Sequence, residues 1–239
     1  MIKRSFLSAL LLLVSSLGFT AAQTRPSDAH SAINLGNKSF AQADYESALR
    51  EYRSVPPSAG ESYAQALYNI GVCYYELWRT SEAIDFYRKA IETRNGRYPR
   101  ASYALGVALE NQKRIAEARD AYQQSIIASN GEYAVAHCRL GLLAAAEGDY
   151  LAAATSFRKA LSHSGAHIPS SHNNLGVVLA HLGRLADARR EFEIALRETG
   201  GNFEDAAYNL KLCRSLMTAP IATQVAIFRG SEIVEEAGQ

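Results

Sequence analysis

Residues 69–91 read NIGVCYYELWRTSEAIDFYRKAI, and their apolar positions follow the spacing of one helical face. Gly71 interrupts that face, although a glycine inside a helix costs roughly 0.5–1 kcal/mol relative to alanine. Ala83 follows twelve residues later and Tyr87 four residues after that, beyond a short turn at residues 78–80. We therefore expect two helices that approach closely at Gly71, with the small side chain of Ala83 facing it.

The same pattern recurs five times at intervals of 35 residues. Each copy has a leucine or isoleucine before the glycine, an alanine twelve residues after it and an aromatic residue four further on. The glycines are Gly36, Gly71, Gly106, Gly141 and Gly176, and the aromatic residues are Tyr52, Tyr87, Tyr122, Phe157 and Phe192. Five copies in register predict five tandem helix–turn–helix units and an all-α fold.

Turn-forming residues also recur between the copies. Each second helix is expected to end at a residue that tolerates the left-handed conformation, and these are Gly60, Asn95, Asn130, Gly165 and Gly200. Pro99 and Pro169 follow at the start of the next unit, a position of a helix that accepts proline.

Residues 69–91 resemble a tetratricopeptide repeat at Gly71, Tyr74, Ala83, Tyr87 and Ala90. The resemblance covers roughly residues 29–202, with a period of 35 in place of the usual 34. The proline often found near the end of a repeat is replaced here by Gly or Asn. The resemblance implies a right-handed α-solenoid whose first helices line a groove for extended peptides or partner segments.

We divide the chain on this basis. The five repeats are residues 29–63, 64–98, 99–133, 134–168 and 169–202, and a capping helix follows at 203–217. The cap is inferred from Lys211, which stands where a glycine would be needed to pack a further helix. The tail, 218–239, either packs as a short helix through Ile221, Val225 and Phe228 or is poorly ordered.

The first 22 residues have the layout of a secretory signal peptide. Lys3 and Arg4 precede an apolar stretch at 6–19, and small residues follow up to Ala22. We expect cleavage after Ala22, a short linker at 23–28, and an exported protein in a periplasm or outside the cell. An uncleaved membrane anchor is the alternative, although 14 apolar residues fall short of the roughly 20 that span a bilayer.

Composition excludes several classes. The 25 basic and 24 acidic residues nearly balance, so nucleic acid is not an expected partner, and after cleavage we expect no membrane insertion. Cys73, Cys138 and Cys213 are odd in number and lie within helical patterns, which favours buried thiols over disulfides. The oligomeric state is left open.

Catalytic motifs for serine hydrolases, phosphate-binding loops and zinc proteases do not occur in the sequence. His163, His167 and His172 have the residue type of a zinc site. Gly165 and Pro169 place them in a loop rather than on one rigid face, so we interpret them as solvated loop histidines. We therefore expect a protein that is not an enzyme and holds no cofactor or metal.

The repeat register selects candidate residues for binding a protein or peptide on the first helices. These are Asn34, Asn37, Phe40, Tyr68, Asn69, Tyr75, Arg100 and Tyr103. Asparagine amides can pair with a peptide backbone, and tyrosines give broad apolar contact with one polar end. Asn69 is the strongest candidate, because asparagine also occupies its register at positions 34, 174 and 209. The alternative, ordinary helix-surface groups, stays open for each of them.

We interpret the chain as an exported scaffold or adaptor that binds a partner and helps to assemble or organise an envelope complex. One alternative is an accessory repeat subunit of a separately encoded enzyme. Another is a clamp for acidic C-termini, as some relatives have, which Asn37, Asn69 and Arg100 match in spacing. Ile33 and Ala104 stand where that clamp has a lysine and an arginine, which would weaken it severely.

Overall fold

The computed structural model describes residues 26–163, 168–218 and 230, and those residues form helices without any strand. The first helices of the five units are α1 (Pro26–Ala41), α3 (Glu61–Glu76), α5 (Pro99–Asn111), α7 (Ala134–Ala146) and α9 (Pro169–His181). The second helices are α2 (Tyr45–Arg53), α4 (Thr80–Thr93), α6 (Ile115–Ala128), α8 (Tyr150–Leu161) and α10 (Leu185–Glu198). α11 (Glu204–Thr218) follows them.

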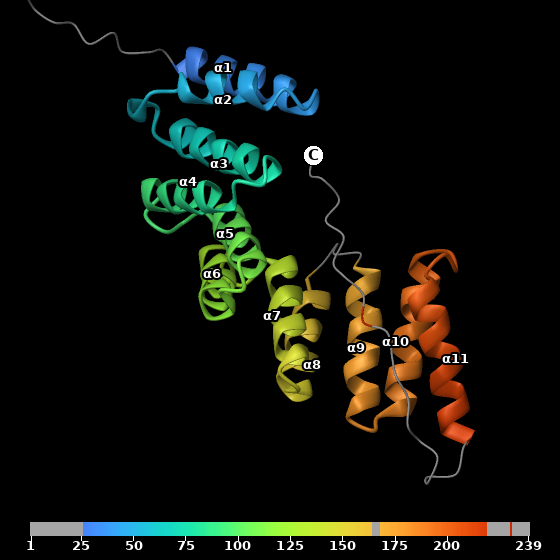
Figure 1. Ribbon diagram of the computed structural model, residues 1–239. Helices are drawn as coiled ribbons and strands as arrows, with labels where there is room; N and C mark the ends of the chain where they lie inside the picture. Colours follow the sequence, from blue (N-terminus) through green and yellow to red (C-terminus); the bar gives the residue numbers. More distant parts are fainter. Residues whose placement is uncertain (1–25, 164–167, 219–229, 231–239) are drawn as a thin grey trace, which may run out of the picture.

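The helix pairs stack in chain order along a curved array (Figure 1). Each first helix packs most extensively on the second helix of its own pair, and each second helix packs on the first helix of the next pair. The predicted right-handed solenoid of five helical pairs with a terminal capping helix is confirmed.

The recurring glycines lie directly beneath aromatic rings. A Cβ atom added to Gly71 would lie 2.6 Å from the ring of Tyr87, and equivalent clashes occur at all five glycines. We expected Ala83 to be the residue facing Gly71, but its nearest atom is a carbonyl oxygen at 3.3 Å, behind the Tyr87 ring. The glycine is therefore required chiefly because a buried ring occupies the space of its missing side chain.

Several helix ends follow the sequence pattern. Asn95, Asn130 and Gly200 have positive φ angles after the second helices, and Pro99 begins its helix, as predicted. Gly165 lies outside the described residues. The turn inside each pair also contains a left-handed residue, which in the second repeat is Trp78, with φ 60° and a side chain that is 91% exposed.

Two ends of the first repeat differ from the expectation. α1 begins at Pro26, within the predicted linker at 23–28, because a proline fits the first helical turn and Asp28 is favourable near a helix N-terminus. α2 ends at Arg53 rather than near Gly60. Pro56 and Pro57 cannot continue that helix, and a 3₁₀ turn, Pro57–Ala59, occupies the connection.

α11 packs on α10, and its Lys211 side chain is exposed at the register of the glycines, as expected for a terminal helix. The predicted signal peptide lies outside the described residues. The tail beyond Thr218 also lies outside the described residues, apart from Gly230. Its packing through Ile221, Val225 and Phe228 therefore stays a prediction.

The three cysteines are free thiols with buried side chains, as predicted. Burial raises the pKa of the Cys73 thiol to about 12 and that of the Cys138 thiol to about 11. Both therefore remain protonated at neutral pH, which makes them poor nucleophiles. They act as small core residues.

Replacement of Gly71 by leucine should overpack the α3–α4 pair against the Tyr87 ring. We expect Gly71→Leu to lower the free energy of unfolding by at least about 1–3 kcal/mol, measured by urea denaturation followed by circular dichroism. Gln65→Leu, at an exposed position of the same helix, should change it by less than about 0.5 kcal/mol. Equal stability of Gly71→Leu and the wild type would contradict the glycine–ring account.

Candidate functional site

The first helices form one face of the array. α1 contacts α3 directly, and α7 and α11 both contact α9, in addition to the contacts within each pair. Residues that lie two positions before the recurring glycines, or one position after them, occupy this inner face. The candidate site is the part of it formed by α1, α3 and α5.

Asn37 and Asn69 form an amide pair across the first two repeats. The Nδ2 group of Asn69 donates to Oδ1 of Asn37 at 3.1 Å, and the Tyr52 hydroxyl donates to the same oxygen at 2.8 Å. Burial raises the pKa of Tyr52, so its hydroxyl stays protonated as a donor. Within the described residues, the Nδ2 group of Asn37 and Oδ1 of Asn69 have no further partner. One donor and one acceptor are thus left side by side for a ligand.

The other candidates on α1 and α3 surround this pair. Asn34 is exposed, and Phe40 is half-buried with its ring edge-on to Tyr45 at 5.4 Å between centroids. Tyr68 is half-buried between the rings of Tyr87 and Tyr98, with centroids 5.8 and 5.6 Å away. Phe40 and Tyr68 therefore pack against other aromatic rings and keep part of their surface exposed on the same two helices as the amide pair.

Tyr75 lies near the C-terminal end of α3, and its hydroxyl accepts a hydrogen bond from the amide of Asn111 on α5. Burial is the main cause that raises the pKa of Tyr75, so its own proton remains available for donation. Asn111 is exposed, and its position in the repeat was not among those that the sequence pattern selected for the inner face.

Tyr103 differs from the expectation that it lines an open groove. Its side chain is only 3% exposed, because the rings of Tyr122 and Tyr133 pack against it at 5.6 and 5.7 Å. Its hydroxyl accepts a hydrogen bond from Nε of Arg139 at 3.3 Å. Tyr103 therefore orients a cation from α7 instead of offering its own ring face to a ligand.

Arg139 was missed by the sequence analysis, although it shares the register of Asn69 two repeats later. It is half-buried, beside a second hydrogen bond in which the Tyr122 hydroxyl donates to Glu110 at 2.6 Å. Burial and the Glu110 carboxylate raise the pKa of Tyr122, which keeps this hydroxyl protonated. The third and fourth repeats thus present one basic and one acidic group close together.

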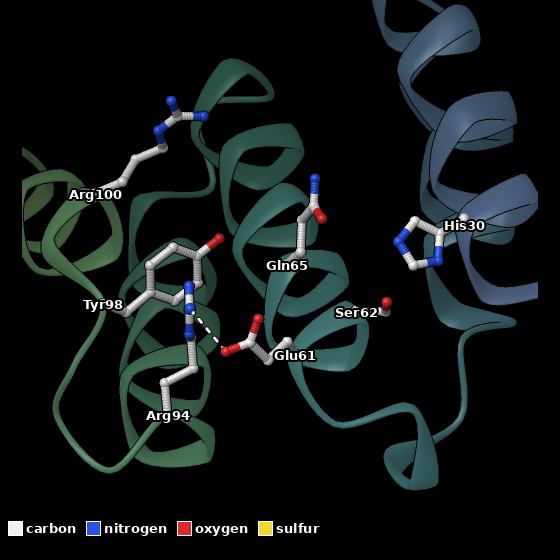
Figure 2. A pocket seen from close by; sticks show the side chains of 7 residues that line it. All are labelled: His30, Glu61, Ser62, Gln65, Arg94, Tyr98 and Arg100. Atoms are coloured by element: carbon white, nitrogen blue, oxygen red, sulfur yellow. Dashed lines mark hydrogen bonds and ion pairs between the residues drawn. The ribbon is translucent and has the colours of Figure 1, made fainter. Parts of the chain in front are cut away.

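A pocket of about 340 Å³ lies toward the N-terminal ends of α1, α3 and α5. Its lining residues are His30, Glu61, Ser62, Gln65, Arg94, Tyr98 and Arg100 (Figure 2). His30, Gln65 and Arg100 occupy the same register in successive repeats. Equivalent positions of three successive repeats therefore line the pocket together.

The two arginines of the pocket have different roles. Arg94 pairs with Glu61 at 3.1 Å and stacks over Tyr98, with its guanidinium 4.6 Å from the ring centroid. Arg100 is exposed and has no ion pair among the described residues, so it is the available cation of the site. Ile33 is buried in the core and Ala104 is half-buried, which leaves Arg100 without the other two cations of a carboxylate clamp.

The histidines near the fourth and fifth repeats are not solvated loop residues where the structure describes them. The ring nitrogens of His163 lie 2.6 Å from the Lys159 carbonyl and 2.7 Å from the Gly131 carbonyl. Nδ1 of His172, on α9, lies 2.7 Å from the Glu191 carboxylate of α10. His167 falls outside the described residues, among which no cluster of three possible metal ligands occurs.

Comparisons with known proteins agree with this architecture. A family profile described as tetratricopeptide repeat matches residues 28–98, 93–133 and 138–208. A search of curated protein sequences found no match.

Several solved structures have the same fold. MamA from Desulfovibrio magneticus RS-1 is 19% identical, with a TM-score of 0.59 over 73% of this chain and 97% of that chain. YrrB, described as a TPR protein with an unusual peptide-binding site, is 23% identical, with a TM-score of 0.58 over 77% and 92%. BtubC from P. vanneervenii is 16% identical, with a TM-score of 0.61 over 89% of each chain. Identities this low show the fold alone.

His137 predicts a pH dependence of stability in the fourth repeat. Burial lowers its pKa, outweighing its contact with the Gly131 carbonyl, and His163 and Lys159 act in the same direction as burial. The neutral ring therefore stabilises the folded state above the unfolded pKa of about 6.5, and this contribution is lost as the pH falls through the folded pKa. We expect thermal melts between pH 7.5 and pH 5 to show a smaller loss of stability for His137→Gln than for the wild type. Equal losses would contradict this role.

Proposed function

The chain belongs to the tetratricopeptide repeat family, and we propose that it is an exported adaptor whose inner face binds an extended segment of a partner protein. The family fold is typically a non-catalytic scaffold for protein interactions. The observation that carries the proposal is the Asn37–Asn69 pair, which offers one amide donor and one carbonyl acceptor on the inner face.

This pair suits the backbone of an extended peptide. A peptide group in an extended chain presents a carbonyl acceptor and an N–H donor, and the Asn37 donor and Asn69 acceptor complement them. The hydrogen bond to Tyr52 fixes Asn37, and the contact between the two amides fixes Asn69. Little side-chain entropy is then lost on binding, which favours recognition of a backbone independently of its sequence.

The surroundings of the pair suggest which peptides are preferred. Phe40, Tyr68 and Tyr75 offer partly exposed aromatic surface for apolar side chains. Arg100, at the neighbouring pocket, is an unpaired cation suited to one acidic side chain of the ligand. A single cation favours an internal acidic residue over the doubly charged end of an acidic C-terminus.

We further propose that the chain acts after export, in the assembly or organisation of an envelope complex. Support comes from the sequence: basic residues at positions 3 and 4, an apolar stretch and a small-residue end at Ala22. Within residues 26–163 and 168–218, no helix is long and apolar enough to cross a membrane.

Peptide binding is tested by selecting linear peptides from a displayed random library on the purified protein. We expect Asn37→Ala and Asn69→Ala each to weaken the selected peptides about three- to tenfold in fluorescence anisotropy, as the loss of one neutral hydrogen bond implies. Asn202→Ala, in the exposed loop before α11, is the matched control and should leave affinity unchanged. Full affinity in the double variant Asn37→Ala/Asn69→Ala would refute the assignment of this site.

Export is tested by expressing the full sequence in a Gram-negative host and measuring the mass of the purified product. We expect a chain that begins at Gln23 in the periplasmic fraction, whereas Ala22→Phe should block cleavage, because a small residue is needed at that position. A wild-type product that keeps residues 1–22 and sediments with membranes would support the anchor instead.

A further inference from the structure

The inner faces of α1, α3 and α5 carry equivalent side chains at the pocket. His30, Gln65 and Arg100 line it from these three helices, with Gln65 between the other two (Figure 2). On α3, Asn69 follows Gln65 by four residues, about one helical turn, and Tyr75 follows Asn69 by six. Because an α-helix rises about 1.5 Å per residue, the positions of Gln65 and Tyr75 lie about 15 Å apart along the axis of α3. Asn69 therefore lies between the pocket and Tyr75.

The pocket end of this stretch is positively charged. With His30 neutral, the charged lining residues are two arginines and one glutamate, and Arg94 already pairs with Glu61 at 3.1 Å. Arg100 is exposed and has no ion pair within the part of the chain that the structure describes. A carboxylate that entered the pocket would therefore find this guanidinium available for a charge-assisted hydrogen bond. The pocket favours an acidic side chain of a ligand.

The opposite end, at Tyr75, is negatively charged. Burial is the main cause that raises the pKa of Tyr75, and Glu76 and Glu110 act in the same direction. The hydrogen bond from Asn111 and the charge of Arg139 oppose them. Two carboxylates thus lie near the Tyr75 hydroxyl against one cation, which disfavours an acidic ligand side chain there. The partly exposed ring of Tyr75 suits an apolar side chain instead.

We propose that the inner face selects extended peptides in which an acidic side chain and an apolar side chain stand four residues apart. The acidic side chain enters the pocket at Arg100, and the apolar side chain lies on the ring of Tyr75. The Asn37–Asn69 pair binds the backbone of the residues between them. This specificity rests on the peptide-binding function proposed above and deepens it.

The spacing of four follows from the geometry of an extended chain. Such a chain advances about 3.3 Å per residue, so a distance of about 15 Å corresponds to four or five residues. Successive side chains of an extended chain point to opposite sides. Only the even spacing therefore directs both side chains toward the protein.

The spacing is tested with synthetic peptides of neutral sequence that carry one glutamate at a fixed position. A single leucine is placed three, four or five residues from the glutamate, on either side of it, and affinities are measured by fluorescence anisotropy. In one of the two chain directions, we expect the spacing of four to bind at least about threefold more tightly than three or five. Equal affinities at all three spacings in both directions would overturn the proposal.

The assignment of the acidic side chain to the pocket is tested by charge reversal. We expect the wild type to prefer the glutamate peptide over its lysine counterpart about three- to fivefold, as an exposed ion pair implies. Arg100→Glu should lose or reverse that preference. Arg97→Glu changes another exposed arginine that does not line the pocket, and as the matched control it should keep the preference. Circular dichroism melts show whether each variant is folded, and an unchanged glutamate preference in folded Arg100→Glu would contradict the assignment.

The outcomes separate this specificity from the peptide-binding function on which it rests. If Asn37→Ala/Asn69→Ala weakens binding while the wild type shows no preference for spacing or for glutamate, the peptide site stands and the specificity is overturned. If no peptide binds the folded wild type, both are overturned.

Discussion

The contact between an aromatic ring and a glycine is the constraint on which the rest of this structure depends. In each of the five pairs, the ring from the second helix occupies the place where a Cβ atom of the first helix would otherwise be. The contact fixes both the separation of the two helices and the rotation of the first helix about its own axis. Since the contact repeats every 35 residues, the residues on the inner face also repeat in register.

The same aromatic residues connect the packing of each pair to the inner face. Tyr52 places its ring on Gly36 and extends its hydroxyl to Asn37, and Tyr122 places its ring on Gly106 and extends its hydroxyl to Glu110. Phe157 and Phe192 fill the equivalent space without a hydroxyl. The N-terminal repeats therefore hold polar groups on the inner face that the last two repeats cannot hold in this way, and the predicted peptide site lies where the tyrosines are.

The fold was predictable because its signal is local and repeated: the glycine, the alanine and the ring recur within each 35-residue unit. The details that escaped prediction depend on neighbours from other units. Tyr103 is covered by Tyr133 from the following connection, and Arg139 reaches its hydroxyl from the next repeat. The early end of α2 reflects two adjacent prolines that interrupt an otherwise regular unit.

The exposed Trp78 has a practical consequence for work in solution. It is the one tryptophan of the chain, and its ring projects into solvent from a turn instead of packing in the core. Because the indole is already exposed to water in the native protein, the wavelength of its fluorescence emission is a poor indicator of whether the helices are intact. Conversely, a partner that contacted the edge of the array formed by this turn would shift the emission wavelength without altering the fold. Trp78 is thus an intrinsic fluorescent reporter of binding at this edge of the array.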